Sequence, residues 1–217
     1  MQKEFWLERW QQNQTGFHRT TYNSNLLKFF PLLNQKAPAH IFVPLCGKSL
    51  DMLWLRDAGY HVTGVEVSQL AVNAFFAENN IEHQISKNNQ FTKYASKNLE
   101  VWLGDFFALE QNHLPKIDAV YDRAAAVAMP ADMRGHYFTR LKALLNNHTQ
   151  ILLVAMEYEH DEPFGPPFSV TAENICEHFG ASYQIDELNS RIIEDIPANF
   201  AKKQITITEK AYRISRG

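Results

Sequence analysis

The sequence has 217 residues, the usual length of a single domain, and 45% of them are hydrophobic, enough to bury a sizeable core. The 21 basic and 24 acidic residues nearly balance. No stripe of Lys and Arg stands out, which disfavours binding to nucleic acid or to an anionic membrane. No apolar run approaches the ~20 residues that a membrane-spanning helix needs.

Cysteine and histidine usage points to an ordinary reduced protein. Cys46 and Cys176 lie 130 positions apart, so neither a disulfide framework nor a paired zinc site is expected. The histidines are scattered one per element without metal-ligand spacing, and we therefore expect no metal. Residues 1–6 lack the basic-then-apolar pattern of a signal peptide, which favours a cytoplasmic location.

The first 35 residues are predicted to be helical. Apolar residues recur at turn spacing from Phe5 to Trp10, Thr15-Gly16 interrupts the pattern, and a second helical stretch ends before Pro31. We interpret residues 1–35 as an N-terminal helical lid and 40–217 as the α/β core of one domain.

Strands and helices then alternate over most of the chain. The apolar runs predict strands at 40–45, 61–67, 99–103, 117–121, 150–156, 183–194 and 203–214. The intervening patterns predict helices from Ser49 to Gly59, from Ser68 to Asn79, at 130–145 and at 172–179, with Ser49 and Ser68 as caps. Such alternation indicates a parallel sheet with crossover helices.

Two segments depart from this alternation. The last two strands are joined by residues 195–202 without a predicted helix, so they should pair antiparallel. Residues 85–98 hold three Asn, three Lys and no Val, Leu, Ile or Met after Ile85. We interpret them as a surface excursion and assign them no role.

The turn after the first strand contains Gly47. Gly47-Lys48-Ser49 matches the end of a phosphate-binding loop, but Phe42 stands where that loop needs a glycine. A dinucleotide-binding turn needs three glycines, and only Gly47 is present in this one. Glu66 ends the second strand 19 residues later, near the ~20-residue offset of an acid that binds ribose. A cofactor with a ribose and no phosphate, such as S-adenosylmethionine, satisfies both facts; a solvated strand end is the alternative for Glu66.

The next two strand ends should face the same crevice, because ligands of open α/β sheets bind at the carboxyl ends. Asp105 could accept from an adenine amino group while Phe106 packs on the ring; the alternative is a turn with a core phenylalanine. Asp122-Arg123 is followed by small residues, which suits close approach of a ligand. The alternative there is a surface ion pair of little weight.

Six motifs stand in a recognisable order. They are Trp6-Leu7-Glu8-Arg9-Trp10, Thr15-Gly16-Phe17-His18, Phe42-Val43-Pro44-Leu45-Cys46-Gly47-Lys48-Ser49, Gly64-Val65-Glu66-Val67-Ser68, Tyr121-Asp122-Arg123-Ala124-Ala125 and Gly165-Pro166-Pro167-Phe168. Over nearly the whole chain this set closely resembles the thiopurine S-methyltransferase family, particularly its bacterial members. The resemblance implies a Rossmann-like, mostly parallel seven-stranded sheet with helices on both faces, an antiparallel C-terminal strand pair and the N-terminal helical lid.

The resemblance also implies an activity and a set of cofactor contacts. The expected reaction is methylation of aromatic or heterocyclic thiols such as thiopurines by S-adenosylmethionine, which becomes S-adenosylhomocysteine. Trp10 would cover the cofactor from the N-terminal helix. Leu45 and Gly47 would line its methionine end, and Glu66 would hold the ribose hydroxyls.

The remaining implied contacts lie around the other end of the cofactor and the acceptor. Asp105 and Phe106 fall where the family contacts adenine, and Phe17 and Arg123 fall where it meets the thiopurine. Arg123 is also expected to contact the cofactor and is the candidate catalytic residue. Its guanidinium stays protonated, so it cannot be a base, but it could stabilise an anion developing on the purine.

Three alternatives stay open. The natural acceptor could be a selenium or tellurium compound or another small soft nucleophile. The chain could instead be a nucleoside-binding module without turnover, although Trp10 and Phe17 supply a lid that sensing does not require. An NAD enzyme is the weakest alternative. We expect a monomer with a small-molecule partner, because no hydrophobic interface stripe stands out.

Two further interpretations concern packing. Cys46 is expected to be a packing residue and Lys48 to be exposed to solvent. The aromatic residues divide into a packing set and a site set. The packing set is Phe29, Phe42, Phe75, Phe76 and Phe138, and the site set is Trp10, Phe17, Phe106 and Phe168.

Overall fold

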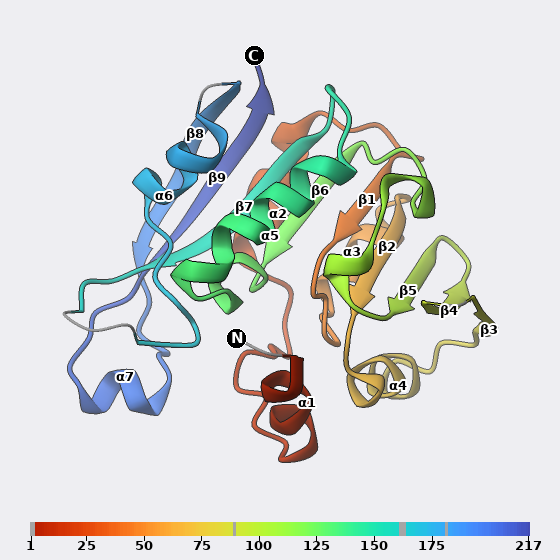
Figure 1. The fold of residues 1–217 in the computed structure, drawn as a ribbon, viewed down its shortest axis with the longest axis horizontal. Coiled ribbons are helices and arrows are strands. Elements are labelled where there is room, and N and C mark those ends of the chain that lie inside the picture. Colours follow the sequence, from red (N-terminus) through yellow and green to blue (C-terminus); the bar gives the residue numbers. More distant parts are fainter. Residues whose placement is uncertain (1–2, 89, 161–163, 181) are drawn as a thin grey trace.

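The computed structural model describes residues 3–88, 90–160, 164–180 and 182–217. Residues 1 and 2 of the predicted lid, and residues 89, 161–163 and 181 of the predicted core, lie outside the described residues. One mixed sheet carries the fold (Figure 1). Its strands are β1 His40–Val43, β2 His61–Glu66, β3 Gln84–Lys87, β4 Thr92–Ser96, β5 Leu99–Leu103, β6 Ala119–Arg123, β7 Gln150–Glu157, β8 Tyr183–Ile192 and β9 Thr208–Arg216. Their order across the sheet is β3-β4-β5-β2-β1-β6-β7-β9-β8.

The helices connect these strands and cover the sheet. They are α1 Lys3–Gln11, α2 Ser24–Phe29, α3 Asp51–Asp57, α4 Gln69–Glu78, α5 Ala131–Leu144, α6 Ala172–Phe179 and α7 Ala198–Lys202. Short 3-10 helices lie at Phe30–Leu33, Phe106–Ala108, Gln111–His113 and Ala126–Ala128. Among the described helices, none is both long and apolar enough to cross a membrane.

The expected caps are half right. The Ser68 hydroxyl accepts from the backbone N–H of Ala71 at 3.3 Å and caps α4 as predicted. The prediction for Ser49 is wrong, because the residue before α3 is Leu50, which carries no capping side chain. Ser49 lies one residue too early and accepts instead from the N–H of Asp51 at 3.3 Å.

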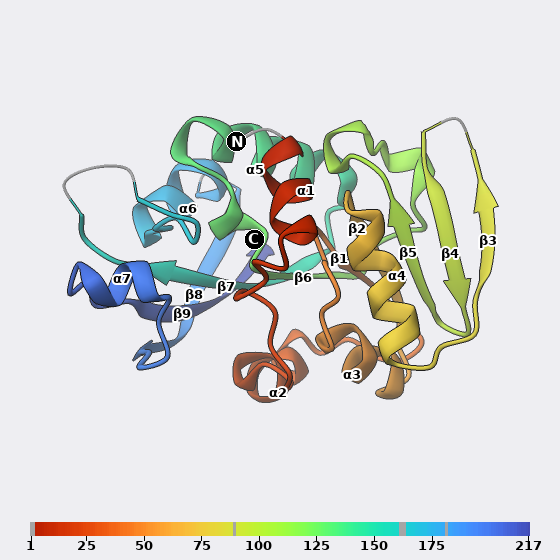
Figure 2. The same ribbon diagram turned by 90° about the horizontal axis from the view of Figure 1, so that it is seen from below.

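The five central strands, β5, β2, β1, β6 and β7, are parallel, which confirms the predicted parallel core. Successive residues of β1 point to opposite faces: Ile41 and Val43 pack with α2, α3 and α4, whereas Phe42 packs with α5 and α6. Figure 2 shows α5 and α6 on one side of the sheet and α2 and α3 on the other. Because both faces are covered, these strands read as continuous apolar runs.

The prediction of seven strands is wrong: the described sheet has nine. The two additional strands, β3 and β4, form an antiparallel hairpin within the segment expected to be a surface excursion, and β4 pairs with β5. All four residues of β3 are exposed, and Tyr94 is the one buried residue of β4. Because this hairpin lies at the edge of the sheet and buries few side chains, its sequence lacks the alternation of apolar and polar residues that marks a core strand.

The C-terminal strand pair is antiparallel as predicted, with β9 between β7 and β8. The expectation that no helix joins these strands is wrong, because α7 lies between them and β9 begins only at Thr208. The small apolar cluster of Tyr158, Phe200, Ile205 and Ile207 explains this helix. Phe200 reaches that cluster from α7 and is fully buried.

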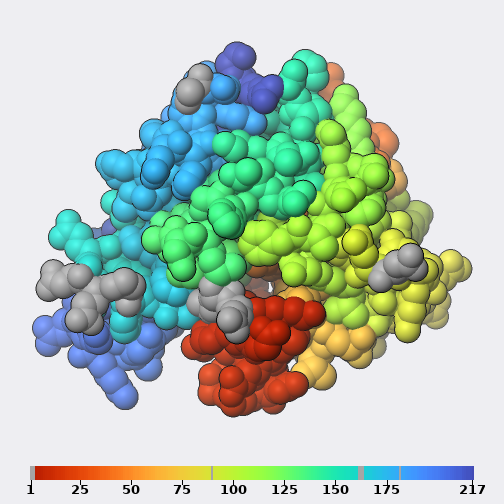
Figure 3. All heavy atoms as spheres, viewed as in Figure 1, coloured from red at the N-terminus to blue at the C-terminus, as the bar shows by residue number. Residues whose placement is uncertain are grey.

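The two N-terminal helices have different places. Figure 1 shows α1 beyond the ends at which the central parallel strands terminate. In the space-filling view of Figure 3, the red N-terminal segment lies at the lower centre of the molecule. By contrast, α2 packs on the sheet through Leu26 and Phe29, and its Asn25 side chain donates to Glu209 of β9 at 2.9 Å. Of the two helices, only α1 covers the strand ends.

Candidate active site

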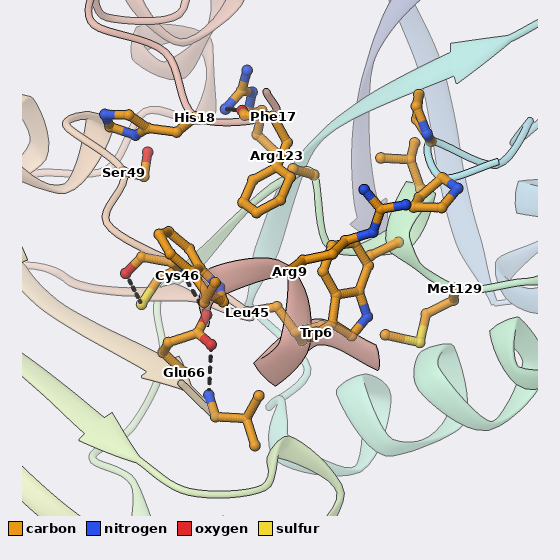
Figure 4. Close-up of a pocket in the computed structure, with 18 of the residues that line it drawn as sticks. Trp6, Arg9, Phe17, His18, Leu45, Cys46, Ser49, Glu66, Arg123 and Met129 are labelled. Carbon is orange, nitrogen blue, oxygen red and sulfur yellow. Dashed lines mark hydrogen bonds between the residues drawn. The ribbon is translucent and has the colours of Figure 1, made fainter. Parts of the chain in front are cut away.

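A cavity of about 760 Å³ lies at the carboxyl ends of the parallel strands, beneath α1. The turns that follow β1, β2, β5 and β6 form its floor, and residues 3–19 contribute the facing wall. Figure 4 shows these side chains converging from both sides. Eight sequence-predicted site residues line this cavity, namely Trp10, Phe17, Leu45, Gly47, Glu66, Asp105, Phe106 and Arg123. The prediction for Phe168 is wrong, because the cavity lining includes its neighbours Gly165, Pro166 and Pro167 but not Phe168 itself. Its size is in the range of small-molecule sites, roughly 300–1,000 Å³.

The turn after β1 brings the chain close to α1 at Gly47. Gly47 has a φ of +53°, a left-handed conformation that side chains with a Cβ disfavour. A Cβ added there would lie 3.2 Å from Cζ2 of Trp10. Glycine is therefore needed both for the turn and for the close approach of the indole, which is itself 9% exposed.

Glu66 ends β2 as a buried carboxylate held by backbone amides. Its Oε1 accepts from the N–H groups of Val67 at 2.8 Å and Ser68 at 2.7 Å, and its Oε2 accepts from Gly47 at 2.8 Å. Burial raises the pKa of Glu66, and the amide hydrogen bonds oppose that rise. A carboxylate has about four acceptor positions, so Oε2 retains one for a ligand hydroxyl. The alternative of a solvated strand end is wrong, because Glu66 is 7% exposed.

An aromatic cluster forms the wall on the α1 side. The ring of Phe17 lies edge-on to Trp6 and Trp10, with centroid separations of 5.6 and 5.4 Å. Trp6 in turn contacts Phe5 at 5.3 Å. Such edge-to-face pairs stabilise each other by about 0.5–1.5 kcal/mol beyond burial, so α1 and the segment after it hold a defined surface toward the cavity.

Asp105 and Phe106 follow β5 as predicted, but their surroundings differ. The exposed carboxylate of Asp105 accepts from the N–H of Phe107 at 2.9 Å and caps a 3-10 turn. Phe106 is 4% exposed and packs on Phe42 and Tyr137, with centroids 6.4 and 5.1 Å away. Phe106 therefore belongs both to the core and to the cavity wall. The interpretation as a core phenylalanine and the interpretation as a ligand contact both agree with this position.

Arg123 at the end of β6 is half-buried, and its Nη1 donates to the backbone carbonyl of Phe17 at 3.3 Å. The alternative of an Asp122–Arg123 surface pair is wrong, because neighbouring strand residues point to opposite faces. Asp122 is fully buried and accepts from the hydroxyl of Tyr137 at 2.6 Å and from the N–H of Ala126 at 3.1 Å. Burial raises the pKa of Asp122 to about 6.

Cys46 is a packing residue, as expected. It is 6% exposed, and a Cβ on Gly64 would lie only 2.7 Å from its Sγ. Burial and the nearby Glu66 raise the pKa of the Cys46 thiol well above its usual value, which keeps it protonated and unreactive. The prediction that Lys48 is exposed is wrong: its side chain is 17% exposed and forms a salt bridge of 2.7 Å with Glu78.

Histidines carry no metal cluster in the described residues, where no three His, Cys, Asp or Glu side chains are placed to hold an ion. The sequence placed His40 and His61 on separate elements, but the structure brings them together. They are paired residues of the neighbouring strands β1 and β2, and their rings stack with centroids 4.8 Å apart. Each is the first residue of its strand, so both lie at the amino ends of the parallel strands, opposite the cavity.

Several cavity residues were not predicted from the sequence. The missed residues are Trp6, Arg9, His18, Arg19, Met129, Met133, Met156 and Ile193. Trp6 and Arg9 are three positions apart, so they share a helix face, and this spacing beside Trp10 was the available signal. Burial lowers the pKa of His18, and the positive charges of Lys48 and Arg123 add to this effect.

The chain is similar in sequence to a family of known proteins over its whole length. The thiopurine S-methyltransferase family matches residues 1–217. The thiopurine S-methyltransferase of Pseudomonas fluorescens is 39% identical over 217 residues, covering all of this chain and 98% of that protein.

Solved structures share the fold at lower identity. A SAM-dependent methyltransferase from Anabaena variabilis has a TM-score of 0.68 at 15% identity, over 99% of this chain and 95% of that one. The 1,6-didemethyltoxoflavin-N1-methyltransferase of Burkholderia thailandensis, solved with S-adenosylhomocysteine, has a TM-score of 0.61 at 15% identity, over 98% and 87%.

The sheet order and the cavity at the strand ends are those of a Rossmann-like fold, and the full-length family match and the 39% identical relative identify the chain as an S-adenosylmethionine-dependent methyltransferase. Within that class, the full-length match and the 39% identity show that the chain belongs to the thiopurine S-methyltransferase family. The alternative of a binding module without turnover, and that of an NAD enzyme, are therefore set aside.

Proposed function

We propose that this enzyme transfers a methyl group from S-adenosylmethionine to the sulfur of aromatic or heterocyclic thiols such as thiopurines. One observation carries the proposal: a single cavity joins the buried carboxylate of Glu66 to an aromatic wall and to the cation of Arg123. The carboxylate suits a ribose, the wall suits a flat ring, and the cation suits a thiolate. The relative named above carries the same activity in its name.

The residues on the β1–β2 side fit the cofactor. Glu66 Oε2 has an acceptor position left for a ribose hydroxyl, and Leu45 and Gly47 bring the backbone to the cavity without a side chain at 47. Asp105 is exposed at the end of β5 and lines the cavity, which supports its accepting from the adenine amino group, with Phe106 beside the adenine ring. When bound, S-adenosylmethionine supplies an electrophilic methyl group on its sulfonium sulfur.

The chain contributes alignment and electrostatics. Trp10 and Phe17 cover the cavity and exclude water from the reacting sulfur. Arg123 holds a positive charge at the same wall and stabilises the thiolate that attacks the methyl group. Heteroaromatic thiols ionise readily, so no strong base is required. Arg123 therefore acts on charge and orientation rather than by removing a proton.

We also propose S-adenosylhomocysteine as the released product, a monomer as the working form and the cytoplasm as its location. Described residues of this one chain form both the sheet side and the α1 side of the cavity, which supports a site contained in a single copy. The near balance of 21 basic and 24 acidic residues gives no reason to expect nucleic acid as a partner. The stretch 1–217 works as one domain in this proposal, with the α1 segment as its lid.

The test is a labelled methyl-transfer assay with aromatic thiols, selenols and metalloid anions in parallel. Methylation of 6-mercaptopurine at the sulfur, identified by mass spectrometry, supports the proposal. If only selenium or tellurium compounds accept the label, the acceptor class is wrong while the methyl donor stands. If label is transferred to none of them, the proposed activity is contradicted.

A further inference from the structure

Two buried N–H groups of α1 lack an acceptor. Nε of Arg9 and Nε1 of Trp6 are both inaccessible to water and have no hydrogen-bond partner among the described residues. A buried donor without an acceptor costs about 1–3 kcal/mol. Both side chains line the cavity from neighbouring positions on one helix face. Because the two nitrogens themselves are covered by protein atoms, a ligand in the cavity satisfies them only once the side chains turn toward it.

Their place in the cavity separates them from the cofactor side. In Figure 4, Arg9 and Trp6 lie on the Met129 side, whereas Glu66 and Leu45 lie on the opposite side. Met156 of β7 lines the cavity together with Met129. If the cofactor ribose is at Glu66, then Arg9 and Trp6 face the part of the cavity that remains for the methyl acceptor.

The charge of Arg9 is not neutralised by the protein. Among the other cations of the cavity, Arg19 forms a salt bridge with Asp195 and Lys48 forms one with Glu78. In the described part of the chain no salt bridge involves Arg9. Its guanidinium rests over the ring of Phe5, 4.5 Å from the centroid, which holds it in place without cancelling its charge.

We propose that Arg9 and Trp6 bind an anionic oxygen group on the methyl acceptor, so that the enzyme favours aromatic thiols that carry a carboxylate over neutral ones. The guanidinium supplies the charge, and the indole N–H supplies the second donor. The site then holds its acceptor at two points, Arg123 at the sulfur and the α1 pair at the carboxylate. This inference rests on the proposed function for the identity of the acceptor, but not for the existence of the anion site.

The experiment compares 4-mercaptobenzoate with 4-mercaptobenzamide, which has the same ring and no charge. Calorimetry measures the Kd of each thiol for the enzyme saturated with S-adenosylhomocysteine, and the methyl-transfer assay measures KM. The variants are Arg9→Met, which keeps the stem, and Trp6→Phe, which keeps a ring against Phe17. Glu8→Gln is the matched control, because Glu8 is exposed on the same helix and outside the cavity lining.

We expect Arg9→Met to weaken 4-mercaptobenzoate binding by about 10-fold or more, the scale of a lost charged hydrogen bond. Trp6→Phe should weaken it severalfold, and Glu8→Gln should change nothing. Binding of 4-mercaptobenzamide should stay within about twofold in all variants. Equal loss for both thiols, or no loss for either, overturns the inference.

Two more outcomes separate the inference from its basis. If Arg9→Met weakens S-adenosylmethionine instead of 4-mercaptobenzoate, the bound carboxylate is that of the cofactor and the inference is overturned. If calorimetry shows the expected charge dependence but no thiol is methylated, the anion site stands and the proposed function fails. The Trp6→Phe variant provides the same readout should Arg9→Met not fold.

Discussion

The guanidinium of Arg123 and the backbone carbonyl of Phe17 are joined by a hydrogen bond of 3.3 Å across 106 positions of sequence. Arg123 ends β6 in the parallel core, and Phe17 belongs to the segment that follows α1. This bond ties the N-terminal segment to the sheet at the wall of the cavity. Arg123 therefore has two roles to test. It supplies a positive charge to the cavity, and it attaches the N-terminal segment to the sheet.

Replacing Arg123 with alanine should chiefly raise the KM for the methyl acceptor, by about 10-fold, because a charged hydrogen-bond donor is lost. Arg123→Lys retains the positive charge and should show a smaller rise. Steady-state kinetics with 6-mercaptopurine measures both. An acceptor KM that is unchanged in the alanine variant would rule out this role.

Replacing Gly47 with alanine should weaken S-adenosylmethionine binding severalfold. The φ of +53° disfavours any Cβ, and the added methyl would lie 3.2 Å from the Trp10 indole, which must move. Each kcal/mol of strain should also lower Tm by roughly 2–4 °C for a protein of this size. Calorimetric binding and thermal unfolding report the two effects separately.

Gly16→Ala is the matched control for that substitution. Gly16 lines the same cavity, but a Cβ there would have nothing within 4 Å. The affinity of the Gly16→Ala variant for S-adenosylmethionine and its Tm should stay at the wild-type values. Equal losses in the Gly16 and Gly47 variants would show that the left-handed turn and the Trp10 contact are not the cause.

The two cysteines should differ sharply in reactivity. Cys176 is exposed on α6, whereas Cys46 is buried and burial raises the pKa of its thiol. Iodoacetamide at pH 8 should therefore add one label per chain, at Cys176, and leave methyl transfer intact. Peptide mass spectrometry locates the label. Rapid labelling of Cys46 in the folded protein would contradict its assignment as a packing residue.

Asp122 should give the protein a pH-dependent stability. Its pKa in the folded state is about 6, above the ordinary 3.8, because burial penalises the charged form. The folded state thus binds this proton more tightly than the unfolded state does. The resulting contribution to the free energy of unfolding is complete below about pH 4 and is lost as the pH rises through 6. A rise of about two units corresponds to roughly 3 kcal/mol.

The Asp122→Asn variant cannot titrate at this position. The unfolding free energy of the wild type, measured relative to this variant by urea denaturation, should fall between about pH 4 and pH 6.5 and then level off. Tyr137→Phe, which removes the hydroxyl that donates to Asp122, keeps the titratable carboxyl and is the control. Parallel pH profiles for the wild type and the Asn variant would contradict the raised pKa.

Much of the fold was predictable because local patterns reflect burial. Apolar runs such as Ile41–Val43 mark strands covered on both faces, and Ser68 marks the start of α4. The β3–β4 hairpin was missed because Tyr94 is its one buried residue, so hydrogen bonding to β5 rather than side-chain burial makes these segments strands. The α7 helix was missed because one residue, Phe200, anchors it.

The site divides in the same way. Residues at strand ends, such as Glu66 and Arg123, were identifiable because the carboxyl ends of parallel strands meet at one edge. The direction of each side chain was not. Asp122 and Arg123 are adjacent in sequence, yet one is buried against Tyr137 and the other lines the cavity.

The sequence by itself determined the class of fold, the strand ends that meet and the family, because those depend on periodicity and on short motifs. The tertiary structure alone decided which face of α1 covers the cavity and that Arg9 and Trp6 have buried donors that find no acceptor in the described part of the chain. It also decided that Asp122 is buried and Lys48 paired. These properties come from contacts between residues far apart in the chain, and no local pattern encodes such contacts.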